Sequence, residues 1–293
     1  MRKKVCFVVL FLVALLLVAG APALNLPQGN FPALPAYTPQ QPVRVALVLG
    51  GGGCRGLAHL GAIRELEAVG IRPDLIIGCS AGSMIGALYA DDPTLAEAEE
   101  ALLNLKRPDL LDMSFFQSRF GPVKGKALQK FMKDHLSSHT FEELKIPLIV
   151  VATDLLTGDL VELSHGPLPL AVRASCSFPG LFNPVLFQGR YLVDGGVVSP
   201  TPVEVAKKYG AQFIIAIDVS EKLSESKPKQ LFGIMKRGIE ISYRRLAEQS
   251  LQGADVVIKM EFENLGLFTD DRNHEIYTHG REKALAAVQK LKQ

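Results

Sequence analysis

From Val43 onward, short apolar runs alternate with longer amphipathic stretches. Runs in which nearly every residue is apolar are typical of parallel strands that are buried on both faces of a sheet. The predicted strands are residues 43–50, 75–78, 147–153, 212–219 and 255–260. Gly158 and Asp159 lie between two further apolar positions, Leu155 and Leu163, and predict a hairpin there.

The stretches between these runs carry apolar residues at helical spacing. The predicted helices are residues 57–69, 82–90, 94–105, 125–136, 202–209, 229–251 and 275–292. Such alternation predicts one three-layer α/β domain, in which helices cover both faces of a largely parallel sheet. No internal repeat and no second linker interrupts the pattern, so we assign the domain to residues 43–293.

The predicted helix at residues 229–251 has two interpretations. Leu231, Met235, Ile239 and Leu246 recur at helical spacing, and several basic residues accompany them. A helix that lies on a membrane surface has this pattern. An ordinary helix with its apolar side toward the core has it as well, and we expect the ordinary arrangement.

The first 23 residues have the pattern of an export signal. Three basic residues at positions 2–4 precede an apolar run at 5–19, and small residues at 21–23 suit a signal peptidase. An uncleaved anchor is the alternative, because roughly 20 apolar residues suffice to cross a bilayer. The expected location is periplasmic or secreted, or else N-terminally membrane-anchored. Residues 24–42, rich in Pro and Gln, predict an extended linker.

Charge and cysteine content exclude some classes of function. The chain has 32 Lys and Arg against 30 Asp and Glu, and loss of positions 2–4 leaves 29 against 30. This balance gives no electrostatic basis for binding nucleic acid. The four cysteines form no C-x-x-C pair and have no metal-ligand spacing. This pattern argues against a zinc site and against a disulfide scaffold. No cofactor is predicted, and the sequence does not indicate the oligomeric state.

The first glycine-rich turn, residues 50–56, joins a predicted strand to a predicted helix. Gly51, Gly53 and Gly56 match the G-x-G-x-x-G of dinucleotide sites, but the next strand has no acidic residue at its end to bind a ribose. Leu57 stands where a P-loop would need Lys followed by Ser or Thr. Backbone N–H groups at such a helix start can still hold an anion, including the oxyanion of an acyl-transfer intermediate.

The second turn, residues 78–82, reads G-x-S-x-G with Ser80 at its centre. It follows a buried strand and precedes a helix, and its two glycines allow the sharp bend that exposes a nucleophile. The helix that follows stabilises a developing alkoxide. If the strands before the two turns are neighbours, both turns lie at the carboxyl edge of the sheet, where open α/β sheets bind ligands. Ser80 is therefore the predicted nucleophile.

A serine nucleophile needs a base. Asp194 ends a short apolar run and precedes two glycines, which permit the close backbone approach that a base requires. Asp154 and Asp218 also follow buried strands, where an acid usually orients a loop. His274 or His279 would complete the Ser–Asp–His order of an α/β-hydrolase triad, although neither lies in a glycine-bounded apolar turn. A triad esterase is the alternative to a Ser–Asp pair.

These segments resemble the patatin-like phospholipase family. Residues 51–56 resemble its G-G-G-x-[KR]-G oxyanion loop, residues 78–82 its G-x-S-x-G elbow, and residues 194–196 its D-G-[GA] motif. Residues 173–182 also resemble a segment of bacterial members, and the similarity extends over about residues 43–219. The resemblance implies a Ser–Asp dyad without a catalytic histidine, no metal, and acyl-ester substrates that are typically phospholipids or lysophospholipids.

The resemblance also implies a mechanism. Asp194 accepts the proton of Ser80 while the Ser80 oxygen attacks the ester carbonyl. Backbone N–H groups of Gly51, Gly52 and Gly53 then bind the oxyanion. Water activated by the aspartate finally releases the acyl group.

Arg55 follows the glycines and has three possible roles: it steadies the loop, attracts a lipid phosphate, or forms a salt bridge on a helix face. The predicted function is that of a serine acyl-ester hydrolase of the phospholipase A or lysophospholipase type, which contacts membranes peripherally. A catalytically silent lipid-binding module on the same fold is the alternative from another class.

Overall fold

The computed structural model describes residues 33–114, 120–222, 228, 230–262, 265–266 and 268–291. The predicted export signal and the first part of the predicted linker lie outside these residues and stay predictions. In the described part of the linker, Tyr37 packs edge-on against Tyr209 with 5.2 Å between ring centroids. None of the described helices combines the length and the apolar character that crossing a bilayer requires.

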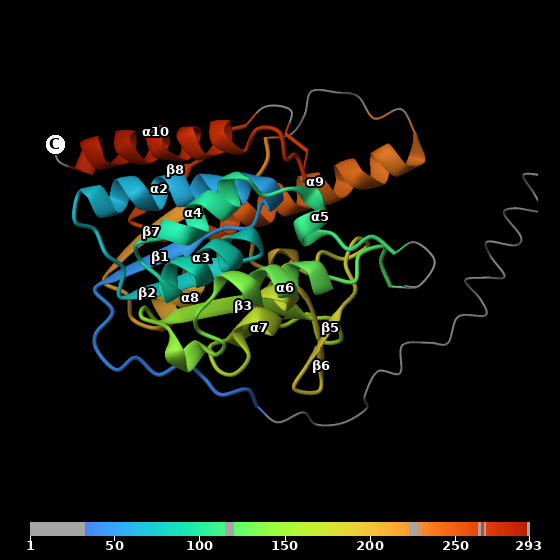
Figure 1. Cartoon of the computed structure of the whole chain (residues 1–293), viewed down its shortest axis with the longest axis horizontal. Coiled ribbons are helices and arrows are strands. Elements are labelled where there is room, and N and C mark those ends of the chain that lie inside the picture. The colour runs from blue at the N-terminus through green and yellow to red at the C-terminus, as the bar shows by residue number, and fades with distance from the viewer. Residues whose placement is uncertain are drawn as a thin grey trace, which may run out of the picture. The chain divides into compact units, whose positions relative to one another are not determined.

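An eight-stranded sheet forms the centre of the domain (Figure 1). The strands run in the order β5-β6-β3-β2-β1-β7-β8, and β4 pairs with β3 beside this path. Neighbours from β3 through β2, β1 and β7 to β8 are parallel, whereas β4, β5 and β6 pair antiparallel. The strands are β1 (Val45–Leu49), β2 (Leu75–Cys79), β3 (Leu148–Asp154), β4 (Leu160–Leu163), β5 (Val185–Phe187), β6 (Arg190–Asp194), β7 (Phe213–Asp218) and β8 (Val256–Lys259).

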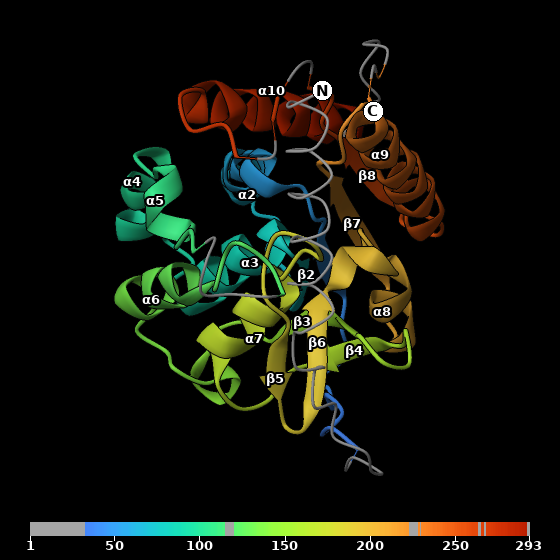
Figure 2. The same ribbon diagram turned by 90° about the vertical axis from the view of Figure 1, so that its right-hand side faces the viewer.

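Helices cover both faces of this sheet, as Figure 2 shows. Most of them pack on one face, while α8 and α9 lie toward the other. The α-helices are α2 (Leu57–Ala68), α3 (Ala81–Asp91), α4 (Ala96–Leu103), α5 (Arg107–Leu110), α6 (Lys126–His135), α7 (Leu168–Ser175), α8 (Val203–Lys208), α9 (Leu231–Ser250) and α10 (Asn273–Leu291). The predicted three-layer α/β class is confirmed.

The central strands bury alternate residues in two separate apolar clusters. In β1, Leu47 and Leu49 belong to the cluster under α2 and α3, whereas Ala46 and Val48 belong to the cluster under α8. Burial of one large apolar side chain contributes about 1.5–3 kcal/mol to folding. Burial on both faces explains why these strands read as almost uninterrupted apolar runs.

Each predicted strand and helix is present with ends within two residues of the prediction. The predicted hairpin is present as β3 and β4. The short apolar run that ends at Asp194 is β6. Of the remaining α-helices and strands, α5, α7 and β5 escaped prediction. They are short, and α7 carries Pro169 in its first turn, so none gives a periodic signal of useful length.

Strands β2 and β6 meet end to end along one side of β3. β2 runs parallel to β3 until Cys79 lies opposite Val151, and β6 runs antiparallel until Asp194 lies opposite Ala152. β4 pairs with both of these β3 residues, so it occupies the other side of β3. The carboxyl ends of β2 and β6 therefore face each other, and Ser80 directly follows β2.

Candidate active site

Ser80 lies in a strained turn between β2 and α3. Its φ of 50° and ψ of −123° place a non-glycine residue in a left-handed conformation, which costs on the order of 1–3 kcal/mol. The flanking glycines are required by crowding. A Cβ atom at Gly82 would lie 2.1 Å from the Leu49 carbonyl oxygen, and one at Gly78 would lie 2.5 Å from the Ser83 Cα. The predicted G-x-S-x-G elbow is present.

The Ser80 hydroxyl contacts Asp194 directly. Ser80 Oγ donates a hydrogen bond of 2.7 Å to Asp194 Oδ2. The backbone N–H of Gly196 donates to the other carboxylate oxygen, Oδ1, over 2.8 Å. Asp194 is only 2% exposed. The fold thus joins the two predicted residues, which are 114 positions apart in the sequence.

Two hydroxyl groups and one backbone carbonyl that the sequence did not single out hold this pair in place. Ser175 Oγ accepts the N–H of Ser80 over 2.8 Å. The Ser177 carbonyl accepts the N–H of Asp194 over 3.0 Å, and Thr153 Oγ1 donates to the Asp194 carbonyl over 2.9 Å. Ser175 ends α7 and Ser177 follows it, within the segment 173–182 noted above for its resemblance alone.

Burial changes the acidity of the candidate base. Desolvation raises the pKa of Asp194 from 3.8 to about 6, although the hydrogen bonds from Ser80 and Gly196 act to lower it. A base with a pKa near the working pH combines a useful ionised fraction with a useful proton affinity. The carboxylate is therefore suited to accept a proton from Ser80 at neutral pH.

We expect activity to follow the ionisation of Asp194. kcat/KM for a soluble ester should fall tenfold per pH unit below about pH 6, because the protonated carboxyl group cannot act as a base. Initial rates from about pH 4 to about pH 8 measure this profile. A profile without a step near pH 6 would contradict Asp194 as the base.

The raised pKa of Asp194 also affects the stability of the fold, and this effect has the opposite pH dependence to the activity. The folded state binds the Asp194 proton more tightly than the unfolded state, so stability falls as pH rises from about 4 to about 6. At higher pH the buried charge costs on the order of 3 kcal/mol. Activity and this contribution to stability therefore change in opposite directions across this interval.

The glycine-rich loop lies against the elbow. A Cβ atom at Gly51 would lie 3.2 Å from the Ser80 Cβ. The N–H of Gly51, however, donates to the Pro200 carbonyl over 2.9 Å. This bond contradicts the predicted role of Gly51 as an oxyanion donor, because its N–H is already paired. The N–H groups of Gly52 and Gly53 form no hydrogen bond with described residues, and they stay predicted donors.

His59 fixes the start of this loop. Its side chain is fully buried in α2, and its Nε2 lies 2.7 Å from the Gly50 carbonyl oxygen. Burial lowers the pKa of His59 to about 4. The imidazole is therefore neutral at neutral pH, and its Nε2–H donates to the carbonyl. This contact fixes the position of Gly50 at the start of the loop.

Arg55 joins the loop to the segments that follow β7. Only 2% of the side chain is exposed. Its Nε donates to the Val219 carbonyl over 2.9 Å, and its Nη1 lies 3.1 Å from the Glu221 carboxylate. Of the three roles considered for Arg55, the contacts favour steadying the loop. A phosphate contact is not supported, because the buried guanidinium already faces a carboxylate.

Tyr243 of α9 brings a phenol to the same place. A Cβ atom at Gly51 would lie 2.6 Å from the Tyr243 hydroxyl oxygen, and one at Gly196 would lie 3.0 Å from it. The hydroxyl thus lies between the glycine loop and the turn that follows Asp194. Burial, with smaller contributions from Cys79 and Asp194, raises the pKa of Tyr243 well above 10. The phenol stays protonated, and no sequence signal pointed to it.

The two histidines of the triad alternative lie elsewhere. His274 and His279 belong to α10 and line an open pocket of about 520 Å³. The His279 ring packs on Phe262 with 4.8 Å between centroids. Neither histidine forms a hydrogen bond with Ser80 or Asp194. The structure brings the serine to the carboxylate and to neither histidine.

The competing acids have structural contacts. Asp154 accepts the N–H of Leu156 over 2.9 Å and pairs with Arg190 at 3.0 Å. Asp218 accepts the N–H of Ser220 over 2.9 Å. Both acids therefore orient the turns that follow their strands, as expected for acids at strand ends.

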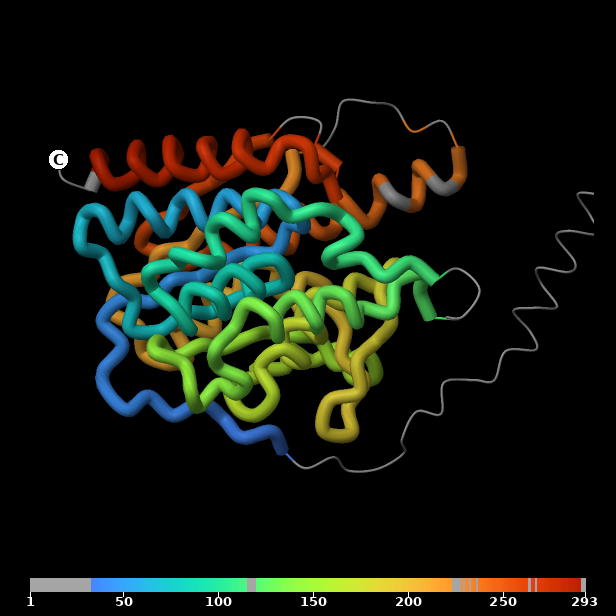
Figure 3. The backbone as a smooth tube through the Cα atoms, viewed as in Figure 1, coloured from blue at the N-terminus to red at the C-terminus, as the bar shows by residue number. Residues whose placement is uncertain are grey.

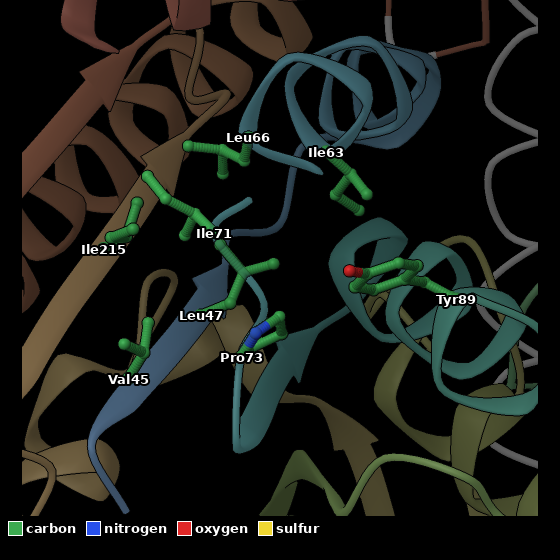
Figure 4. A pocket seen from close by; sticks show the side chains of 8 residues that line it. All are labelled: Val45, Leu47, Ile63, Leu66, Ile71, Pro73, Tyr89 and Ile215. Atoms are coloured by element: carbon green, nitrogen blue, oxygen red, sulfur yellow. The ribbon is translucent and has the colours of Figure 1, made fainter. Parts of the chain in front are cut away.

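A small apolar cavity lies at the opposite end of the sheet (Figure 4). Its volume of about 10 Å³ is near the minimum that holds one water molecule. Val45 and Pro73 place it at the amino ends of β1 and β2, away from Ser80. The lining residues are Val45, Leu47, Ile63, Leu66, Ile71, Pro73, Tyr89 and Ile215. It is a packing void and too small for an acyl chain.

The sequence of this chain is similar to the sequences of known proteins. An uncharacterized NTE family protein of Mycobacterium tuberculosis is 36% identical over 179 residues, which cover 60% of this chain and 49% of that protein. Patatin-like phospholipase domain-containing protein 6 of Homo sapiens is 33% identical over 188 residues, which cover 61% of this chain and 13% of that protein. The match thus spans about half of the mycobacterial relative and a small part of the human one.

Structure and family comparisons agree with this likeness. The crystal structure of VipD from Legionella pneumophila matches with a TM-score of 0.55 at 15% identity, over 85% of this chain and 67% of that one, which shows a shared fold. The family model described as patatin-like phospholipase matches residues 47–207, more than half of the chain. That region contains the glycine loop, the Ser80 elbow and Asp194, which lie together at one edge of the sheet. The chain belongs to the patatin-like phospholipase family.

Proposed function

We propose that this protein is a serine acyl-ester hydrolase of the phospholipase A or lysophospholipase type, with Ser80 as nucleophile and Asp194 as base. The observation that carries the proposal is the 2.7 Å hydrogen bond from the Ser80 hydroxyl to a buried carboxylate. Family membership supports a lipid ester as the substrate. Contact with a membrane or a micelle follows from a substrate of this class.

In the first half-reaction, Ser80 is acylated. Its Oγ attacks the ester carbonyl carbon while Asp194 takes the hydroxyl proton. The N–H groups of Gly52 and Gly53 stabilise the oxyanion, and loss of one such donor typically costs about 100- to 1,000-fold in rate. When the tetrahedral intermediate collapses, the ester C–O bond breaks and the leaving alcohol takes the proton from Asp194.

In the second half-reaction, water replaces the alcohol. Asp194 accepts a proton from the water as its oxygen attacks the acyl carbon, and the same donors hold the second oxyanion. Collapse returns the proton to Ser80 Oγ and releases the fatty acid. The positive end of the α3 dipole, at whose N-terminus Ser80 lies, favours the alkoxide in both steps.

Product analysis tests this function. Phospholipids and lysophospholipids of mixed head group are incubated with the protein, and the products are identified by mass spectrometry. We expect free fatty acid together with an equimolar amount of the deacylated lipid. A fluorophosphonate probe should label the peptide that contains Ser80.

A catalytically silent lipid-binding module would give a different result. It would release no fatty acid from any lipid, leave a soluble p-nitrophenyl ester at its background rate, and take up no probe at Ser80. That combination would contradict the proposal.

A further inference from the structure

Helix α9 exposes a stripe of apolar side chains. Five of them are between 41% and 75% exposed: Leu231, Ile234, Met235, Ile239 and Ile241. At 100° per residue they fall within a sector of about 160° on one side of the helix. The expectation that the apolar side of this helix faces the core is therefore wrong for its first half.

The second half of α9 packs against the active site. The Tyr243 hydroxyl touches the glycine loop, and Ala247 is fully buried. Ser250 Oγ accepts the N–H of Thr201 over 3.2 Å. The first half extends beyond the body of the domain, as Figures 1 and 3 show. One helix thus carries both an active-site phenol and an exposed apolar stripe.

Other exposed apolar side chains lie at the carboxyl edge of the sheet, where Ser80 is located. Leu155 and Leu156 directly follow β3, and Val197 follows Asp194 by three positions. Each of these three side chains is at least 40% exposed. Figure 2 shows this carboxyl edge facing the viewer, with α9 beside it. The apolar surface therefore adjoins the side of the domain on which Ser80 is located.

The charges on α9 indicate which kind of partner this apolar surface binds. The helix has four basic residues and two acidic ones. Arg244 pairs with Glu248 at 3.1 Å, whereas Arg245 is exposed and forms no ion pair with a described residue. Arg245 falls within the apolar sector. A long cationic side chain among apolar ones suits a lipid surface, where the stem lies among acyl chains and the charge reaches an anionic head group.

We propose that the first half of α9, residues 231–241 together with Arg245, binds the surface of an anionic phospholipid bilayer and thereby holds Ser80 at that surface. An apolar stripe with basic neighbours is the pattern of a helix that lies in the interface. The inference deepens the proposed function because it names where the lipid ester is met. The binding itself does not depend on catalysis.

Vesicle binding tests the inference. The full chain is sedimented with vesicles of phosphatidylcholine that contain about 30% phosphatidylglycerol. The double variant Ile234→Glu, Met235→Glu should bind at least about 10-fold more weakly, because two charged side chains would enter the apolar layer. Leu285→Glu is the matched control, since Leu285 is 44% exposed on α10, away from this stripe, and should bind as the wild type does.

Two further readouts separate this inference from the proposed function. The double variant should hydrolyse a soluble p-nitrophenyl ester at the wild-type rate while losing activity on vesicles. Ser80→Ala should bind vesicles like the wild type. If neither the wild type nor any variant hydrolyses an ester, but the double variant still loses vesicle binding, the proposed function is wrong. The inference that α9 binds the bilayer is then still supported.

Three outcomes would overturn the inference. The first is vesicle binding by the double variant at wild-type strength, and the second is an equal loss with Leu285→Glu. The third is that the wild type sediments as a dimer and the double variant as a monomer, while both bind vesicles equally. That result would show that a second copy of the chain covers the stripe. If the double variant does not fold, Ile234→Ser and Met235→Ser are compared in the same way.

Discussion

Ser80→Ala is expected to lower kcat for ester hydrolysis by about 10⁵-fold, to the residual rate that binding and the oxyanion donors sustain. The variant removes the atom that forms the bond to the acyl carbon. It leaves the backbone of the elbow in place, since alanine retains the Cβ atom of serine. Initial rates with a p-nitrophenyl ester, followed by lipid product analysis, measure the effect.

Ser83→Ala is the matched control for this prediction. It makes the same chemical change one turn along α3, where the Ser83 hydroxyl donates to the Ser80 carbonyl over 2.6 Å. We expect it to lose less than about 10-fold, because one neutral hydrogen bond is removed. Equal rates for wild type and Ser80→Ala would show that Ser80 is not the nucleophile.

Asp194→Asn is expected to lower kcat/KM by about 10³- to 10⁴-fold. The amide has nearly the shape of the carboxylate but cannot accept the Ser80 proton. Removal of a buried charge should also raise stability above about pH 6, because the ionised carboxylate opposes folding there. Rates and urea unfolding of the same preparations distinguish lost chemistry from lost fold.

The double variant His274→Ala, His279→Ala is the companion test. Neither side chain contacts the dyad residues, so we expect activity within about 2-fold of the wild type. A double-histidine variant that is folded but inactive would favour a histidine triad. Such a result, with Asp194→Asn still active, would reject the direct transfer of the Ser80 proton to Asp194.

The two residues of the proposed dyad were predictable from local signals. Ser80 follows an apolar strand between two flanking glycines, and Asp194 ends an apolar strand before two glycines. The structure shows why the elbow glycines are needed, because Gly82 has no room for a Cβ atom beside Leu49. A turn that has no room for a Cβ atom requires glycine, so the crowding is visible in the sequence of the turn. The resemblance to the family then paired the serine with the aspartate across 114 positions.

The residues that brace the dyad could not be found in this way. Ser175, Ser177 and Thr153 hold the serine and the aspartate through single hydrogen bonds, which leave no periodic pattern. Tyr243 reaches the glycine loop from a helix 192 positions further along the chain. The first three contacts arise where β2 and β6 meet beside β3, and the contact of Tyr243 arises where α9 packs against the glycine loop.

The sequence by itself indicated the longer strands and helices, both glycine turns and the candidate nucleophile, because apolar spacing and glycine-bounded turns are local features of the chain. Only the tertiary structure decided which way α9 faces and that the Gly51 N–H is taken by Pro200. Helical spacing shows that one side of a helix is apolar, but not what covers it. Likewise, a free or a paired N–H depends on which distant carbonyl the fold brings to it.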